Sequence, residues 1–120
     1  MIKQIKKRDG RILDFDPEKI TNAIFKAAQS VGGKDRSIAE SLAKQVLEIL
    51  DKKSGETENY IPSVEEVQDT VEKVLIEGGH VQTAKAYILH RQKRSEIRKV
   101  KLSLGVADDL KLPLNSITLL

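Results

Sequence analysis

The sequence predicts a mostly α fold, a four-helix bundle preceded by a small N-terminal β-hairpin. Two short strand-like runs flank Asp9-Gly10 near the N-terminus, and this pattern indicates a hairpin. Apolar residues then recur at helical spacing in four segments. Short connections join these segments, and Gly32-Gly33 and Gly78-Gly79 end two of them. Helices of this length with short loops are typical of a bundle.

The hairpin is expected to have strands at about 2–7 and 11–15. Isoleucines in IKQIKK and RILDF favour extended backbone. An Asp-Gly pair between such runs predicts a two-residue turn, because both turn positions accept a positive φ.

The first helix has signals at both ends. Asp16 suits the N-cap and Pro17 suits the first helical position. Gly32-Gly33 suits the C-terminal end. The inward stripe is expected to be Ile20, Ala23, Ile24, Ala27 and Val31.

The second and third helices are separated by the polar segment KKSGETEN, which predicts a loop. The second helix should span about 37–52. Ser63 is expected to cap the third helix, with Glu66 completing a capping box. The expected inward residues are Ile38, Leu42, Val46, Ile49 and Leu50 in the second helix, and Val64, Val67, Val71, Val74 and Leu75 in the third.

The fourth helix is expected at about 80–99, with Val81, Ala84, Tyr87 and Ile88 inward. Residues 2–99 would then form one domain. The remaining segment, 100–120, is apolar without a clean period, and Pro113 interrupts it. We expect it to be a linker or the start of a further domain.

Composition excludes several classes of site. The 120 residues include no cysteine and only two histidines, which leaves no thiolate site and no evident zinc site. Asp108-Asp109 is interpreted as a turn or cap, because consecutive side chains point apart. There is no Gly-Lys-Ser/Thr phosphate loop and no Ser/His/Asp set. We expect no metal site and no catalysis by this chain alone.

Location can also be addressed from the sequence. No run of about 18 apolar residues is present, so no membrane span is expected. The N-terminus lacks the apolar core of a signal peptide. Together with the absence of cysteine, these features fit a cytoplasmic protein.

Charge is distributed unevenly along the chain. Residues 1–34 carry a net charge of +4, residues 35–79 carry −6 and residues 80–120 carry +5. If the two basic ends meet in space, they form a positive region that could hold an anion. The alternative is three solvated surfaces of differing sign.

Cations gather where the first helix begins. Lys7 and Arg8 precede the hairpin turn, and Lys19 lies near the helix N-terminus, where a cation is unfavourable by about 0.3–1 kcal/mol. A hairpin folded over this helix start could direct all three at one phosphate-like anion. On the fourth helix, His90 and Lys93 share a face. Ordinary surface lysines remain the alternative. His90 is not expected to bind a metal, because the sequence shows no second metal ligand at a suitable spacing from it.

These residues resemble a known family. KKRDGRILDFDPEKITNAIFKA is similar to the opening of the ATP-cone domain, and IPSVEEVQDTVEKVL and TAKAYILHRQKR are similar to its third and fourth helices. The resemblance covers about residues 2–96. It implies a helical bundle with a β lid that binds ATP or dATP and regulates the large chain of a ribonucleotide reductase.

The resemblance also implies site residues. Lys7, Arg8 and Lys19 would meet phosphates, and His90 and Lys93 would complete the phosphate site. The segment 13–19 would line adenine and ribose, while Val64 would border the base and Gln68 would face a phosphate. Some members carry a carboxylate where Leu13 stands. The implied nucleotide-binding residues of segment 13–19 are Leu13, Asp14, Phe15, Asp16 and Lys19.

The tail KLSLGVADDLKLPLNSITLL is similar to the link into the catalytic domain of reductases of the adenosylcobalamin-dependent class. The resemblance therefore implies that adenosylcobalamin would act in a catalytic domain beyond Leu120. ATP usually arrives with Mg²⁺, so we expect Mg²⁺ to accompany the nucleotide. The resemblance also implies that the parent enzyme is a homo-oligomer.

Two other functions stay open from the sequence. A nucleotide-responsive nucleic-acid-binding regulator would use the basic ends, but two Phe, two Tyr and no Trp leave little for base stacking. A ligand-free helical interaction module is the other. Salt-dependent DNA retention would indicate the first, and a thermal melt unchanged by ATP would indicate the second.

Overall fold

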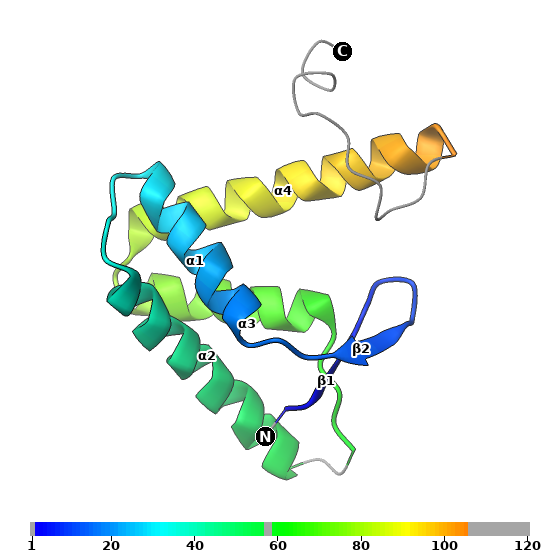
Figure 1. Cartoon of the computed structure of the whole chain (residues 1–120), viewed down its shortest axis with the longest axis horizontal. Helices are drawn as coiled ribbons and strands as arrows, with labels where there is room; N and C mark the ends of the chain where they lie inside the picture. The colour runs from blue at the N-terminus through cyan, green and yellow to red at the C-terminus, as the bar shows by residue number, and fades with distance from the viewer. Residues whose placement is uncertain (1, 57–58, 106–120) are drawn as a thin grey trace. The chain divides into compact units, whose positions relative to one another are not determined.

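The computed structural model describes residues 2–56 and 59–105 (Figure 1). The chain divides into two compact units, Met1–Tyr87 and Ile88–Leu120. Within the described residues, two short strands are followed by four helices. The mostly helical fold class with a small N-terminal hairpin is therefore confirmed.

The hairpin pairs β1 (Gln4–Lys6) with β2 (Ile12–Asp14) in antiparallel fashion, with Ile5 opposite Leu13. Its turn differs from the expected two-residue type. The Gly10 N–H donates to the Lys7 carbonyl at 3.0 Å and the Lys7 N–H donates to the Arg11 carbonyl at 2.7 Å. Gly10 has a φ of 91°, whereas Asp9 stays outside the left-handed region. The turn therefore spans Lys7–Arg11 with one left-handed glycine, and the strands are shorter than expected.

The hairpin is attached to the chain segment that precedes α3 (Val64–Glu77). Lys6 forms a parallel bridge with Ser63, and its N–H donates to the Pro62 carbonyl at 2.9 Å. β1 therefore lies between β2 and this segment. Figure 1 shows β1 next to the segment that leads into α3. The N-terminus is anchored too, because the Ile2 N–H donates to Asp51 Oδ1 at 3.0 Å.

The first helix, α1 (Glu18–Ser30), begins one residue later than expected, with Pro17 at the N-cap position. Asp16 still serves the helix start, because its Oδ1 accepts from the Glu18 N–H at 3.1 Å. Ile20, Ile24 and Ala27 are buried as predicted. Val31 is 45% exposed, which corrects the predicted stripe. It lies beyond the last helical residue, where the backbone has left the helical region.

The second helix, α2 (Arg36–Glu56), is longer than expected and includes residues 52–56 of the segment predicted as a polar loop. Ile38 is 48% exposed, contrary to the prediction, and the adjacent Ala39 faces the core instead. Small residues on this face let helices approach closely, and α1 packs directly against α2. The buried residues of α2 are Ala39, Leu42, Ala43, Val46 and Leu50.

The third helix, α3, begins at the predicted cap, with Ser63 Oγ accepting from the Glu66 N–H at 3.1 Å. The return bond of a capping box, from the Ser63 N–H to the Glu66 carboxylate, is not formed among the described residues. The Glu66 carboxylate lies 3.3 Å from Lys53 Nζ and so links α3 to α2. Gly78 and Gly79 end the helix, the latter at a φ of 79°. Its buried residues are Val67, Thr70, Val71, Val74 and Leu75.

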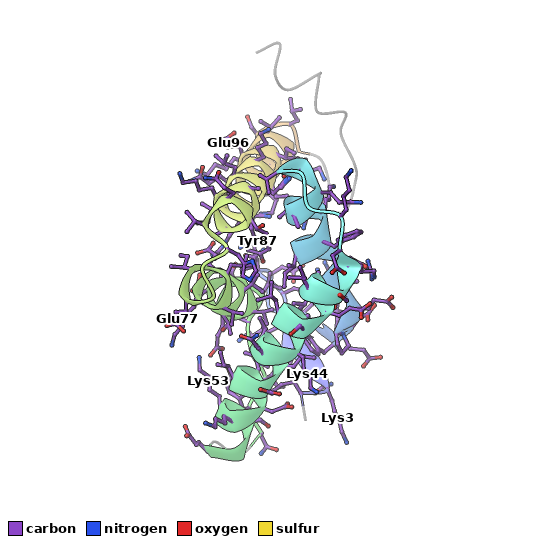
Figure 2. All side chains as sticks on the ribbon, turned by 90° about the vertical axis from the view of Figure 1, so that its left-hand side faces the viewer. Lys3, Lys44, Lys53, Glu77, Tyr87 and Glu96 are labelled. Atoms are coloured by element: carbon purple, nitrogen blue, oxygen red, sulfur yellow. The ribbon has the colours of Figure 1, made fainter. Side chains whose placement is uncertain are left out.

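The fourth helix, α4 (Val81–Ser103), extends past the predicted end at residue 99. Ala84 and Tyr87 are buried in the core of the first unit, whereas Val81 is 51% exposed and corrects the prediction. In Figure 2, Tyr87 lies on the inner side, whereas Lys44 of α2 is exposed. From Ile88 onward the helix belongs to the second unit. Asp108-Asp109 and Pro113 lie outside the described residues.

Ser63→Ala is expected to lower the free energy of unfolding by about 1 kcal/mol, because the Glu66 N–H loses its cap. Urea unfolding followed by circular dichroism measures the change. Ser41→Ala on the exposed face of α2 is the matched control and should not destabilise the chain. Equal losses in both variants would contradict a capping role.

Candidate functional site

The turn of the hairpin presents two adjacent cations to solvent. Lys7 and Arg8 are both exposed, and Gly10 lets the chain reverse just after them. Lys19, in the first turn of α1, is exposed as well. Among the described residues, neither Lys7 nor Lys19 has an ion-pair partner. Two lysines without internal counter-ions are suited to an external anion.

Arg8 reaches from the hairpin to the first turns of α3. Its Nη1 forms an ion pair with Glu65 Oε1, and its Nη2 donates to Gln68 Oε1 at 3.3 Å. The side chains of Arg8 and Glu65 are 31% and 41% exposed. Together with the bridge between Lys6 and Ser63, these contacts hold the turn beside α3. Arg8 and Gln68, which were each predicted to face a phosphate, therefore lie next to one another.

The side chain of Arg11 forms an ion pair within the turn itself. Asp9 Oδ1 accepts from the Arg11 N–H at 3.0 Å, and Asp9 Oδ2 lies 2.6 Å from Arg11 Nε. The backbone N–H of Arg11 is the main reason that the pKa of Asp9 is lowered from its usual value. Both side chains are more than half exposed, at 60% for Arg11 and 54% for Asp9. This pair stabilises the turn, and Lys7 remains the cation of the turn that has no ion pair with a described residue.

The chain from β2 into α1 carries most of the residues predicted to line a base and sugar. Leu13 is 42% exposed and Asp14 is exposed on β2. Phe15 is half-buried against the core, and its N–H donates to the Lys3 carbonyl at 2.9 Å. This bond continues the strand pairing and fixes where α1 starts.

The N–H groups at the start of α1 are already bonded. Asp16 accepts from Glu18 through its side chain and from Lys19 through its carbonyl at 3.1 Å, and Ile20 donates to Pro17 at 3.1 Å. An anion near this helix would therefore be attracted mainly by side-chain cations. The helix dipole would add a smaller contribution.

The first unit thus contains nine of the eleven residues predicted for the site. Val64 is half-buried as the first residue of α3, directly after the Ser63 that bridges to Lys6. His90 and Lys93 lie on α4 in the second unit, with His90 half-buried and Lys93 exposed. Their approach to the hairpin stays a prediction.

Sequence reasoning missed Glu65, the counter-ion of Arg8. A signal was present, because Glu65 and Gln68 are three residues apart and share a face of the helix. It also missed Tyr60, which precedes the start of α3 and is partly buried there. Tyr60 lies near Glu66, and burial is the main reason that the pKa of its phenol is raised, with the carboxylate adding to the effect.

Two structural findings limit the chemistry. Within residues 2–56 and 59–105, no group of three or more His, Asp or Glu side chains could hold a metal ion. No helix in the same ranges is long and apolar enough to cross a membrane. The exposed cations at the hairpin turn and at the start of α1 are suited to the electrostatic binding of an anion.

The chain matches a protein family and several curated proteins. The ATP cone domain matches residues 3–96. A vitamin B12-dependent ribonucleoside-diphosphate reductase of Thermoplasma acidophilum is 46% identical over 125 aligned positions, covering 100% of this chain and 16% of the relative. The protein of the same description from Mycobacterium tuberculosis is 38% identical, covering 98% of this chain and 16% of the relative.

A third relative, an anaerobic ribonucleoside-triphosphate reductase of Salmonella typhimurium, is 32% identical over 78% of this chain and 12% of its own length. The chain therefore spans about one sixth of the length of the first two curated relatives and less of the third.

Proposed function

Because the chain belongs to the ATP-cone domain family, we propose that it binds ATP or dATP and regulates the activity of a ribonucleotide reductase of which it is part. The observation that carries this proposal is the placement of Lys7 and Arg8. The hairpin turn that bears them is bonded to the start of α3, where Arg8 meets Gln68.

Electrostatics supports a triphosphate as the ligand. A nucleoside triphosphate carries about four negative charges, and side-chain cations with a helix N-terminus can offset them. Lys7 and Lys19 have no ion pairs with described residues and supply the first two cations. Arg8 supplies a third, and His90 and Lys93 of α4 would complete the set.

The base would lie against the chain from β2 into α1. Leu13, Asp14 and Phe15 would contact it through backbone and apolar atoms, and Val64 would cover its other edge. Asp16 would border the sugar. ATP and dATP differ by one hydroxyl, so discrimination requires a group that hydrogen-bonds or excludes this hydroxyl.

Mg²⁺ would arrive with the nucleotide and be held mainly by the phosphates, because the described residues offer no cluster of ligands for it. The reductase partner would be the catalytic domain of a longer chain, and adenosylcobalamin would act there. A homo-oligomer is the expected assembly. The nucleotide can shift the activity only through a difference in its affinity for the two states.

Calorimetric titration of the 120-residue chain with ATP, dATP and GTP tests the proposal. We expect saturable binding of ATP or dATP, with GTP weaker by at least about tenfold, which corresponds to about 1.4 kcal/mol. Absence of binding by all three at millimolar concentration would refute a nucleotide site. Equal binding of all three would refute selectivity for adenine.

Arg98→Ala is expected to change ATP affinity by less than about twofold. Arg98 lies eight residues beyond His90, which places it about 12 Å further along the helix and out of reach of the same phosphate. Titration calorimetry with ATP measures the effect. A loss of tenfold or more would place the nucleotide on a later part of α4 than proposed.

A further inference from the structure

We infer that Glu65 is an internal competitor of the nucleotide: its carboxylate occupies Arg8 in the free chain and must release this side chain before Arg8 can bind a phosphate. The inference rests on the proposed function and adds a residue that sets the affinity of the site. Its starting point is the ion pair between Arg8 Nη1 and Glu65 Oε1, which joins the hairpin turn to the first turn of α3.

The pair is suited to exchange. Both side chains are partly open to solvent, at 31% for Arg8 and 41% for Glu65, so an entering anion can reach the guanidinium without unfolding the core. Exposed pairs of this kind contribute little to stability, because water screens the charges. A carboxylate and a phosphate oxygen compete for the same N–H donors, since Arg binds both in the same planar geometry.

Because of Gln68, only one of the two side-chain contacts of Arg8 has to change when a phosphate binds. It accepts from Arg8 Nη2, the other end of the guanidinium, at 3.3 Å. An uncharged amide does not compete electrostatically with a phosphate. Arg8 can therefore keep its orientation through Gln68 while Nη1 changes partner from Glu65 to the ligand.

The ion pairs of the hairpin determine which of its cations are available to a ligand. Asp9 pairs with Arg11, and Glu65 pairs with Arg8. Around the turn and the start of α1, Lys7 and Lys19 are then among the cations without ion pairs to described residues. A triphosphate gains Arg8 as a further cation only by displacing Glu65. A ligand with one phosphate can be satisfied by the two lysines and gains less from the displacement.

The test is a double-mutant cycle on the 120-residue chain, read by titration calorimetry with ATP and with AMP. Glu65→Gln keeps the size of the side chain and removes its charge. We expect it to tighten ATP binding about two- to fivefold, the range that corresponds to an exposed ion pair. AMP binding should change less. In an Arg8→Ala background, the gain from Glu65→Gln should disappear.

Glu77→Gln is the matched control, because Glu77 is an exposed glutamate at the opposite end of the same helix (Figure 2). It removes the same charge and reports the general effect of a less acidic chain. Circular dichroism and thermal melts confirm that each variant is folded.

Each outcome is decisive. Tighter ATP binding in Glu65→Gln that depends on Arg8 supports the competitor role. Unchanged or weaker binding, with the wild-type chain still binding ATP, overturns it and makes Glu65 a structural or orienting partner of Arg8. An equal gain in Glu77→Gln, or a gain that persists without Arg8, overturns it as well. If the wild-type chain binds no ATP, the proposed function fails together with this inference.

Discussion

Lys7→Ala and Lys19→Ala are each expected to weaken ATP binding by about 10- to 100-fold, the range for loss of a charge-assisted hydrogen bond of about 1.5–3 kcal/mol. Both lysines are exposed, and neither has an ion pair with another described residue. Their removal should therefore leave the fold intact. Lys19→Ala should even stabilise α1 slightly, because a cation near a helix N-terminus is unfavourable.

Titration calorimetry with ATP measures these losses, and circular dichroism verifies the helical content. Lys44→Ala is the matched control, because it removes one exposed lysine from the middle of α2 (Figure 2). It accounts for the change in net charge alone. Wild-type affinity in both site variants would remove the phosphate assignment, even if the chain still bound ATP.

Much of the fold could be predicted because its signals are local. Asp16 and Pro17 mark the start of α1, and Ser63 marks the start of α3 by accepting the Glu66 N–H. Such caps depend on residues a few positions apart, so a sequence window contains both partners. The glycine pairs that end α1 and α3 act in the same way.

The errors arose where packing decides between neighbouring faces. A helical stripe predicted Ile38 and Val81 to be inward, but they are 48% and 51% exposed. On α2, Ala39 and Ala43 face the core in place of Ile38, because their small side chains allow α1 and α3 to lie close to this helix. From hydrophobicity alone, isoleucine is expected to be buried before alanine. Close packing against the partner helices favours the smaller alanine at these positions, and the sequence of one helix does not show where its partners lie.

In the candidate site, too, local features could be predicted from the sequence and long-range contacts could not. The cations of the hairpin could be identified from the sequence, since Lys7 and Arg8 stand beside a recognisable turn. Their surroundings could not, because Arg8 meets Glu65 across 57 residues of sequence and Lys6 meets Ser63 across a similar separation. A local sequence pattern does not predict which helix the hairpin will pack against.

The core of the first unit provides the second large effect. Leu75→Ala is expected to lower the free energy of unfolding by about 2–5 kcal/mol, because Leu75 is completely buried in α3 and its loss leaves a cavity. Ile76→Ala is the matched control, since this neighbouring side chain is 55% exposed and its truncation should change stability by less than about 0.5 kcal/mol. Urea unfolding measures both. Equal losses would contradict the orientation of α3.

The same variant connects stability to binding. A ligand that binds only the folded chain at 100 times its dissociation constant adds about 2.7 kcal/mol of stability, so ATP should restore much of what Leu75→Ala loses. The restoration should require the phosphate contacts: at the same ATP concentration, Leu75→Ala combined with Lys7→Ala should recover far less. Thermal melts with and without ATP measure this difference. Equal recovery in the single and double variants would show that ATP stabilises the chain from a place other than the hairpin turn, because Lys7 lies outside the core that Leu75 supports.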